Sequence, residues 1–182
     1  MSDLDILRNG FIAFLDGLWW GLRETVGPLS MYEGYASGFR EMGAEKAEAD
    51  ETKGPEAAAK TAAELFSAIG LDVDVKGREI LVKSCPLWDR ILEKGIEYAF
   101  HVEEICWKPM LEGIGGKSGA KPVVESSLRL IHLEKAKLEY KKKKAKATFD
   151  KGDISKEEYD TQVEEINQVL GKIASQGRYR FD

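Results

Sequence analysis

The feature of this sequence that most constrains its fold is a change in the spacing of apolar residues near residue 70. Before it, apolar residues recur every three or four positions, which places their side chains on one face of a helix. From Leu71 to Ser84, apolar and polar residues alternate, as in strands with one buried face, and Lys76-Gly77 supplies a turn. The sequence therefore predicts the α+β class, with helices followed by a β-hairpin.

Glycine and proline divide the first 70 residues into three predicted helices. Gly27-Pro28 ends the first, and Pro55 begins the third after a charged connection over residues 41–56. Gly70 ends the third helix. The first helix carries an apolar stripe, broadened by Leu15 and Trp19, of Leu4, Leu7, Phe11, Phe14, Leu18, Leu22 and Val26.

A second run of helix and strand follows the hairpin. Pro86 opens a short helix, and a further helix reaches Gly113, where a glycine-rich loop over 113–119 begins. Alternation from Pro122 through His132, with a return ending at Tyr140, predicts two more strands. Because each strand connection is short or passes through one helix, we expect an antiparallel sheet with helices packed on one side.

The last 42 residues differ from the rest in charge. They hold ten basic and eight acidic residues, a net charge of +2. Because the whole chain carries −5, the first 140 residues carry −7. Ser155 and Glu158 form a capping box before a helix with a narrow apolar stripe. We therefore predict two parts: an α+β domain over 1–140, and a C-terminal helical hairpin and tail over 141–182.

Composition excludes several classes of protein. No apolar run reaches the roughly 18 residues that a membrane-spanning helix needs, and the acidic start of the chain is unlike a secretory signal. The net charge of −5 argues against nucleic acid as a partner. Two cysteines are too few for a disulfide scaffold. We therefore expect a cytoplasmic protein without a transmembrane segment.

Two loops resemble binding motifs but lack the required residues. The 113–119 segment contains Gly-Lys-Ser, yet a phosphate-binding loop needs glycine where Leu111 stands, and a strand before the loop. A calcium loop starting at Asp150 would need oxygen ligands at Gly152 and Ile154. The sequence therefore disfavours both nucleotide and calcium binding.

Cys85, His101 and Cys106 are the one cluster of soft metal ligands, and their chemistry suits zinc. On a helix, residues 101 and 106 point about 140° apart, so they cannot both point straight at one ion. The alternative is that both cysteines are buried as small apolar residues and the histidine lies at the surface. His132 is expected in the core.

Aromatic residues are dense on the predicted helix faces, and Gly34 and Gly38 would leave a shallow groove beside Tyr35. Such residues either fill the core or line a pocket for an apolar ligand. The candidate ligand-binding residues are Trp19, Tyr35, Phe39, Trp88, Phe100 and Trp107.

Four segments follow one another in a familiar order: 32–38 (YEGYASG), 84–87 (SCPL), the helix from Cys106, and 122–125 (PVVE). Over residues 10–142 they resemble the 4-vinyl reductase, or hydrocarbon-binding, domain family, which includes small archaeal proteins. The resemblance implies a pocket for a small hydrophobic molecule, and in several members a structural zinc held by cysteines. Cys85 and Cys106 match family cysteines, whereas those expected near Leu128 and Leu138 are absent.

Residues 149–159 (FDKGDISKEEY) resemble a short C-terminal helical hairpin that is appended to many prokaryotic proteins and is associated with oligomerisation or docking. Taken together, the sequence predicts a ligand-binding or sensory protein, supported by zinc and forming a homodimer. Two alternatives stay open. One is a hydrolase of a small cyclic amide-like substrate that uses Cys85 or Cys106 as nucleophile; the other is a scaffold without a ligand.

Overall fold

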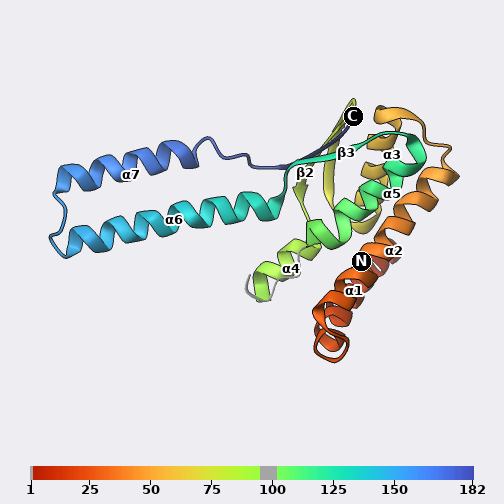
Figure 1. Cartoon of the computed structure of the whole chain (residues 1–182), viewed down its shortest axis with the longest axis horizontal. Helices are drawn as coiled ribbons and strands as arrows, with labels where there is room; N and C mark the ends of the chain where they lie inside the picture. Colours follow the sequence, from red (N-terminus) through yellow and green to blue (C-terminus); the bar gives the residue numbers. More distant parts are fainter. Residues whose placement is uncertain (1, 95–101) are drawn as a thin grey trace.

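The computed structural model describes residues 2–94 and 102–182 (Figure 1). It is mostly helical and contains a small four-stranded antiparallel sheet, so the predicted α+β class is confirmed in outline. In chain order the elements are α1 (Asp3–Val26), α2 (Pro28–Ala49), α3 (Gly54–Ile69), β1 (Asp72–Lys76), β2 (Glu79–Ser84), α4 (Pro86–Lys94), the π-helix η2 (Glu103–Trp107), α5 (Lys108–Ser118), β3 (Pro122–Ser126), α6 (Leu128–Asp150), α7 (Lys156–Leu170) and β4 (Gly177–Phe181).

The sheet has the strand order β1-β2-β4-β3, and every neighbouring pair is antiparallel. One face is apolar and buried, with Ile80 and Phe181 fully covered and Tyr179 packed against Phe66 of α3 at a ring distance of 5.9 Å. The helix α5 contacts both α3 and β3, and α2 packs along α5 (Figure 1). Helices therefore cover this face of the sheet.

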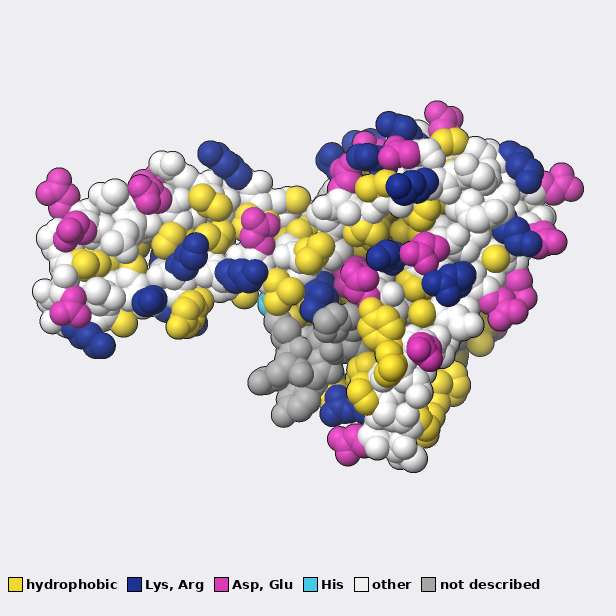
Figure 2. Space-filling model, in the orientation of Figure 1, with side chains coloured by type: hydrophobic (Ala, Val, Ile, Leu, Met, Phe, Trp, Pro, Cys, Tyr) yellow, Lys and Arg dark blue, Asp and Glu magenta, His cyan; other side chains and the backbone are white. Residues whose placement is uncertain are grey.

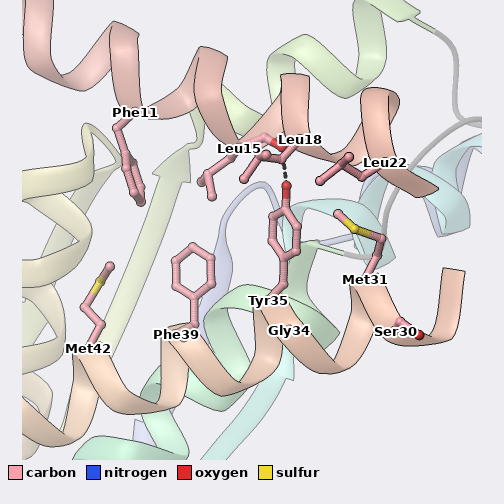
Figure 3. Close-up of a pocket in the computed structure, with 11 residues that line it drawn as sticks. Phe11, Leu15, Leu18, Leu22, Ser30, Met31, Gly34, Tyr35, Phe39 and Met42 are labelled. Carbon is pink, nitrogen blue, oxygen red and sulfur yellow. Dashed lines mark hydrogen bonds between the residues drawn. The ribbon is translucent and has the colours of Figure 1, made fainter. Parts of the chain in front are cut away.

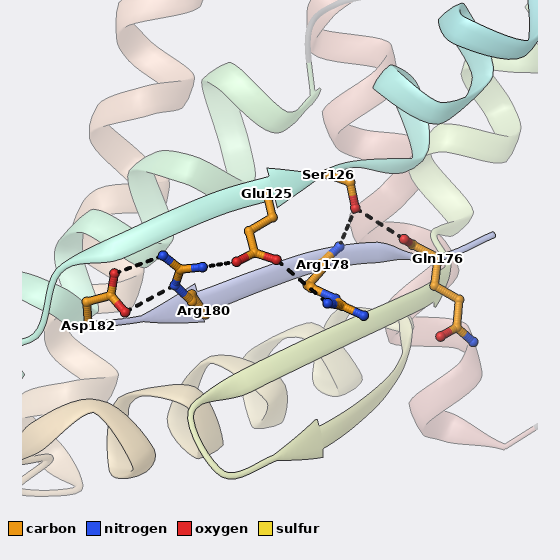
Figure 4. Close-up of polar contacts among 6 residues, drawn as sticks. All are labelled: Glu125, Ser126, Gln176, Arg178, Arg180 and Asp182. Atoms are coloured by element: carbon orange, nitrogen blue, oxygen red, sulfur yellow. Dashed lines mark hydrogen bonds and ion pairs between the residues drawn. The ribbon is translucent and has the colours of Figure 1, made fainter. Parts of the chain in front are cut away.

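The other face of the sheet is polar. Arg180 of β4 pairs with Glu125 of β3, and its Nε lies 3.1 Å from a carboxylate oxygen of Asp182 (Figure 4). The Ser126 hydroxyl accepts from the Arg178 backbone N–H at 3.1 Å. These contacts join β3 to β4 across the exposed side of the sheet.

The predicted second strand pair is wrong beyond β3. Residues 128–140 are the first half of α6 because the Ser127 side chain caps that helix, accepting from the Leu130 N–H at 3.1 Å. The strand that pairs with β3 is β4, some 50 residues later. Two predicted loops are also helical: α5 runs through most of 113–119 to Ser118, and α2 extends through the charged segment to Ala49.

The helices α6 and α7 form an antiparallel pair that projects from the body (Figure 1). Phe149 stacks on Tyr159 with a ring distance of 5.1 Å, and Lys142 Nζ donates to Asn167 Oδ1 at 3.1 Å. The predicted capping box at Ser155 is present. This pair is inserted between β3 and β4, so the boundary expected at residue 140 falls inside α6 and the sequence after it returns to the centre of the sheet.

The face of α1 that packs on the body includes the flank of the predicted stripe, Leu15 and Trp19, and leaves several of its central residues exposed. Ile12, Leu15 and Trp19 are buried, whereas Leu7 and Phe14 of the predicted stripe are 70% and 62% exposed. Figure 2 shows hydrophobic side chains gathered over the part of the molecule where α1 lies. An apolar helix face therefore remains uncovered beside the groove described next.

Candidate functional site

An apolar groove of about 390 Å³ lies between α1 and α2. Side chains from the two helices face each other across it (Figure 3). None of the described residues that line the groove is charged, so its chemistry suits an apolar molecule. The lining residues are Phe11, Leu15, Leu18, Leu22, Ser30, Met31, Gly34, Tyr35, Gly38, Phe39 and Met42.

Small residues on α2 keep this groove open. Ser30, Gly34 and Gly38 stand four residues apart, so they share one face of the helix. A Cβ atom added at either glycine would meet no atom within 4 Å. The glycines therefore leave space in the groove that larger side chains would occupy.

Tyr35 ties the two helices together at the groove. Its hydroxyl donates a hydrogen bond to the backbone carbonyl of Leu15 (Figure 3). Burial is the main cause that raises the pKa of Tyr35 to about 12, so the side chain stays neutral and remains a donor at physiological pH. One turn further along α2, Phe39 packs edge-on to Phe11 of α1 at a ring distance of 6.4 Å. This contact also joins the two helices across the groove.

The predicted ligand-binding aromatics separate into three places. Tyr35 and Phe39 line the groove. Trp19 and Trp107 are buried behind them, in edge contacts with Tyr35 at 6.3 Å and Phe39 at 5.5 Å. Trp88 packs elsewhere, against His132 of α6 at 5.8 Å, and Phe100 lies outside the described residues.

The α1 side of the groove and the two methionines of α2 were not among the predicted ligand-binding residues. Their signal was present in the helical spacing of Phe11, Leu18 and Leu22, but spacing alone does not say whether a face covers a core or a groove.

Cys85 and Cys106 are both buried, and neither forms a disulfide. Burial raises the pKa of the Cys85 thiol to about 12 and that of Cys106 well above its ordinary value, and Glu103 adds to both shifts. Protonated thiols are poor nucleophiles and poor metal ligands, so this environment disfavours a cysteine-dependent hydrolase.

The predicted zinc site is only partly within the described residues, because His101 lies outside them. In the chain segments 2–94 and 102–182, no group of three or more His, Cys, Asp or Glu side chains is arranged to hold a metal ion. The two cysteines would supply two of the four ligands that zinc commonly takes.

We expect both cysteines to resist alkylation in the native protein. Iodoacetamide at pH 8 should modify neither thiol within an hour, because each is shielded and protonated, whereas both should react fully in guanidinium chloride. Mass spectrometry of the intact chain measures the number of adducts. Rapid labelling of one cysteine in the folded chain would show that it is accessible and activated.

Comparison with protein-family models, with curated proteins and with solved structures finds no match to this chain. Among the described residues, no helix combines the length and the apolar composition that crossing a bilayer requires.

Proposed function

We propose that this protein binds a small hydrophobic molecule in the groove between α1 and α2. The observation that carries the proposal is an uncharged groove of ligand-binding size whose space is left by Gly34 and Gly38. The resemblance of residues 10–142 to hydrocarbon-binding domains supports the same function, which is either storage or sensing of an apolar compound.

The groove favours a neutral ligand with an elongated apolar body. Each Å² of apolar surface removed from water contributes roughly 25 cal/mol, and the lining offers side chains from both helices for such contact. The hydroxyl of Tyr35 is engaged with Leu15, and Ser30 stands at one end of the groove. Binding would therefore depend on shape and apolar area more than on hydrogen bonds.

Filling the groove should abolish this binding. In Gly38→Leu the new side chain enters open space, so the fold should persist while affinity for an apolar probe falls at least about tenfold, or about 1.4 kcal/mol. The probe is N-phenyl-1-naphthylamine, whose fluorescence rises in apolar surroundings. Native mass spectrometry of the purified protein measures any bound molecule directly.

Gly10→Leu is the matched control. Gly10 is an exposed helical glycine of α1 with open space at its Cβ, but it does not line the groove. Its probe affinity should equal that of the wild type. If Gly38→Leu also left the affinity unchanged, the groove would not be the binding site.

We further propose that the hairpin of α6 and α7 associates with the hairpin of a second copy. The two helices carry opposite charge: α6 holds lysines at 135, 137, 141–144 and 146, whereas α7 holds five acidic residues between 157 and 165 and one lysine. A twofold arrangement can place the basic helix of one copy on the acidic helix of the other. The absence of any buried residue in α7 supports the need for a partner.

Charge reversal on α6 should weaken this association. The double variant Lys141→Glu/Lys144→Glu should shift the full chain from dimer to monomer at 10 µM, because it places like charges opposite α7 of the partner. Light scattering after gel filtration measures the mass. The control Lys60→Glu/Lys76→Glu makes the same charge change on exposed lysines of the body and should stay dimeric. A monomeric wild type would contradict the proposal.

A further inference from the structure

A second, polar pocket of about 300 Å³ lies where η2 and α5 meet β3 and the start of α6. Part of its wall is apolar and comes from Leu111, Pro122, Val124 and Leu130. The rest carries charge or a hydroxyl and comes from Glu103, Glu104, Lys108, Glu112, Ser127 and Arg129. This pocket shares no residue with the groove between α1 and α2.

Glu103 is the unusual member of this pocket because this acidic residue is only 7% exposed. It receives hydrogen bonds from the Arg129 backbone and the Ser127 hydroxyl. Its second oxygen, Oε2, has no hydrogen-bond partner within the described part of the chain. A buried acceptor without a partner costs about 1–3 kcal/mol, more for a charged group, so a native protein that keeps one requires an explanation.

The backbone at Glu103 is also unusual. Glu103 begins the π-helix η2, which leads directly into α5. A π-helical turn inserts an extra residue, changes the direction of nearby side chains, and is found frequently at functional sites. Here it presents Glu103 to the pocket while its neighbours Ile105 and Cys106 stay in the core.

The other charges of the pocket are balanced locally. Glu104 pairs with Lys108 at 3.6 Å, and Glu112 pairs with Arg40 of α2 at 3.0 Å. Arg129 lies near Glu103 and lowers the pKa of its carboxyl, although burial raises that pKa more. With Arg40 counted against Glu112, Glu103 and Arg129 are the two charged groups of the lining that these two ion pairs leave over.

We propose that this pocket binds a small organic cation, a primary ammonium on an apolar body, whose N–H donates to Oε2 of Glu103. An ammonium has three donors and no acceptor, which matches an acceptor-only carboxylate. The apolar body lies against Leu111, Val124 and Leu130. The unpartnered carboxylate oxygen of Glu103 accepts a hydrogen bond more strongly from a charged donor, which favours a cation over an anion or a neutral alcohol.

The test compares 2-phenylethylamine with 2-phenylethanol, which has nearly the same shape without the charge. At pH 7.5 the amine should raise the Tm of the wild type in a saturable way, and the alcohol should bind at least tenfold more weakly. Glu103→Gln should lose the response to the amine. The control Glu41→Gln, which removes an exposed carboxylate of α2 that does not line the pocket, should keep it.

Stability against pH shows whether Glu103→Gln is folded and whether Glu103 is buried as described. Because burial raises its folded pKa, the folded state binds more protons than the unfolded state above the ordinary value of 4.5. The Tm of the wild type relative to that of Glu103→Gln should therefore fall as pH rises from 4.5 through the folded pKa of Glu103, because the variant lacks this carboxyl. Three outcomes would each overturn the proposal: the alcohol binds as well as the amine, Glu103→Gln still binds the amine, or the wild type does not respond to millimolar amine. Water would then be the partner of Oε2.

Discussion

A chain that ends at residue 140 should not fold. It lacks β4, which lies between β2 and β3, so β3 would lose its neighbour and β2 would become an edge strand. It also lacks Tyr179 and Phe181, which are 1% and 0% exposed. Removal of a buried aromatic side chain costs about 3–5 kcal/mol, so the two together approach the whole stability of an ordinary domain. Circular dichroism should show no cooperative thermal transition.

The matched variant removes most of the hairpin of α6 and α7 but keeps β4. Lys142 and Asn167 are hydrogen-bonded across the hairpin at 3.1 Å, so excision of residues 143–166 and closure by a four-residue turn requires little movement. This shortened chain should melt cooperatively within about 5 °C of the wild type, because the small side chain of Ala145 is the one buried side chain that it loses. If the chain ending at 140 melted cooperatively at the wild-type temperature, β4 would not be an integral strand.

Local sequence signals predicted the elements that depend on near neighbours. Gly27-Pro28 separates α1 from α2, and Gly70 ends α3 in the left-handed region with φ 108°, as expected for a helix-terminating glycine. The hairpin of β1 and β2 was predictable because its alternation and its turn at Gly77, with φ 58°, lie within 14 residues. Each signal specifies backbone geometry that nearby residues complete.

The fourth strand could not be placed in this way. Residues 177–181 alternate between arginine and aromatic side chains, but residues 128–132 alternate as well. The difference is that Ser127 caps a helix before Leu128, and that α6 continues through lysines, alanines and leucines that favour helix. Pairing of β3 with β4 spans the whole hairpin, and no local pattern reports which distant strand is the neighbour.

The candidate groove was predictable from one side only. Tyr35, Phe39 and the two glycines lie on α2, and their spacing already indicated a shared face. The rotation of α1 depends instead on polar contacts of Asp16, one within α1 and one with α4. Buried Asp16 accepts from Trp20 Nε1 at 3.1 Å and from Arg90 of α4 at 3.1 Å, so this polar residue faces inward while Phe14 faces solvent. An apolar stripe alone would have predicted the opposite orientation.

Gly113→Ala should destabilise the fold by about 3 kcal/mol, near the upper end of what overpacking costs. At Gly113, α5 approaches the backbone of α2 so closely that a Cβ atom would overlap the carbonyl oxygen of Arg40 and lie 2.9 Å from the amide nitrogen of Ala44. Gly43 of α2 makes the reciprocal approach to the Met110 carbonyl. Backbone atoms cannot turn aside as a flexible side chain can, so the two helices must separate.

Gly116→Ala is the control on the same helix. A Cβ there would meet nothing within 4 Å, so the alanine should stabilise the protein by about 0.5–1 kcal/mol through its higher helix propensity. Urea unfolding followed by circular dichroism measures both changes. Opposite signs for the two substitutions would locate the close contact of α2 and α5 at Gly113. If both variants were equally stabilised, α2 and α5 could not pack at the separation described. The groove between α1 and α2 would then have a different shape, because its α2 wall rests on this contact.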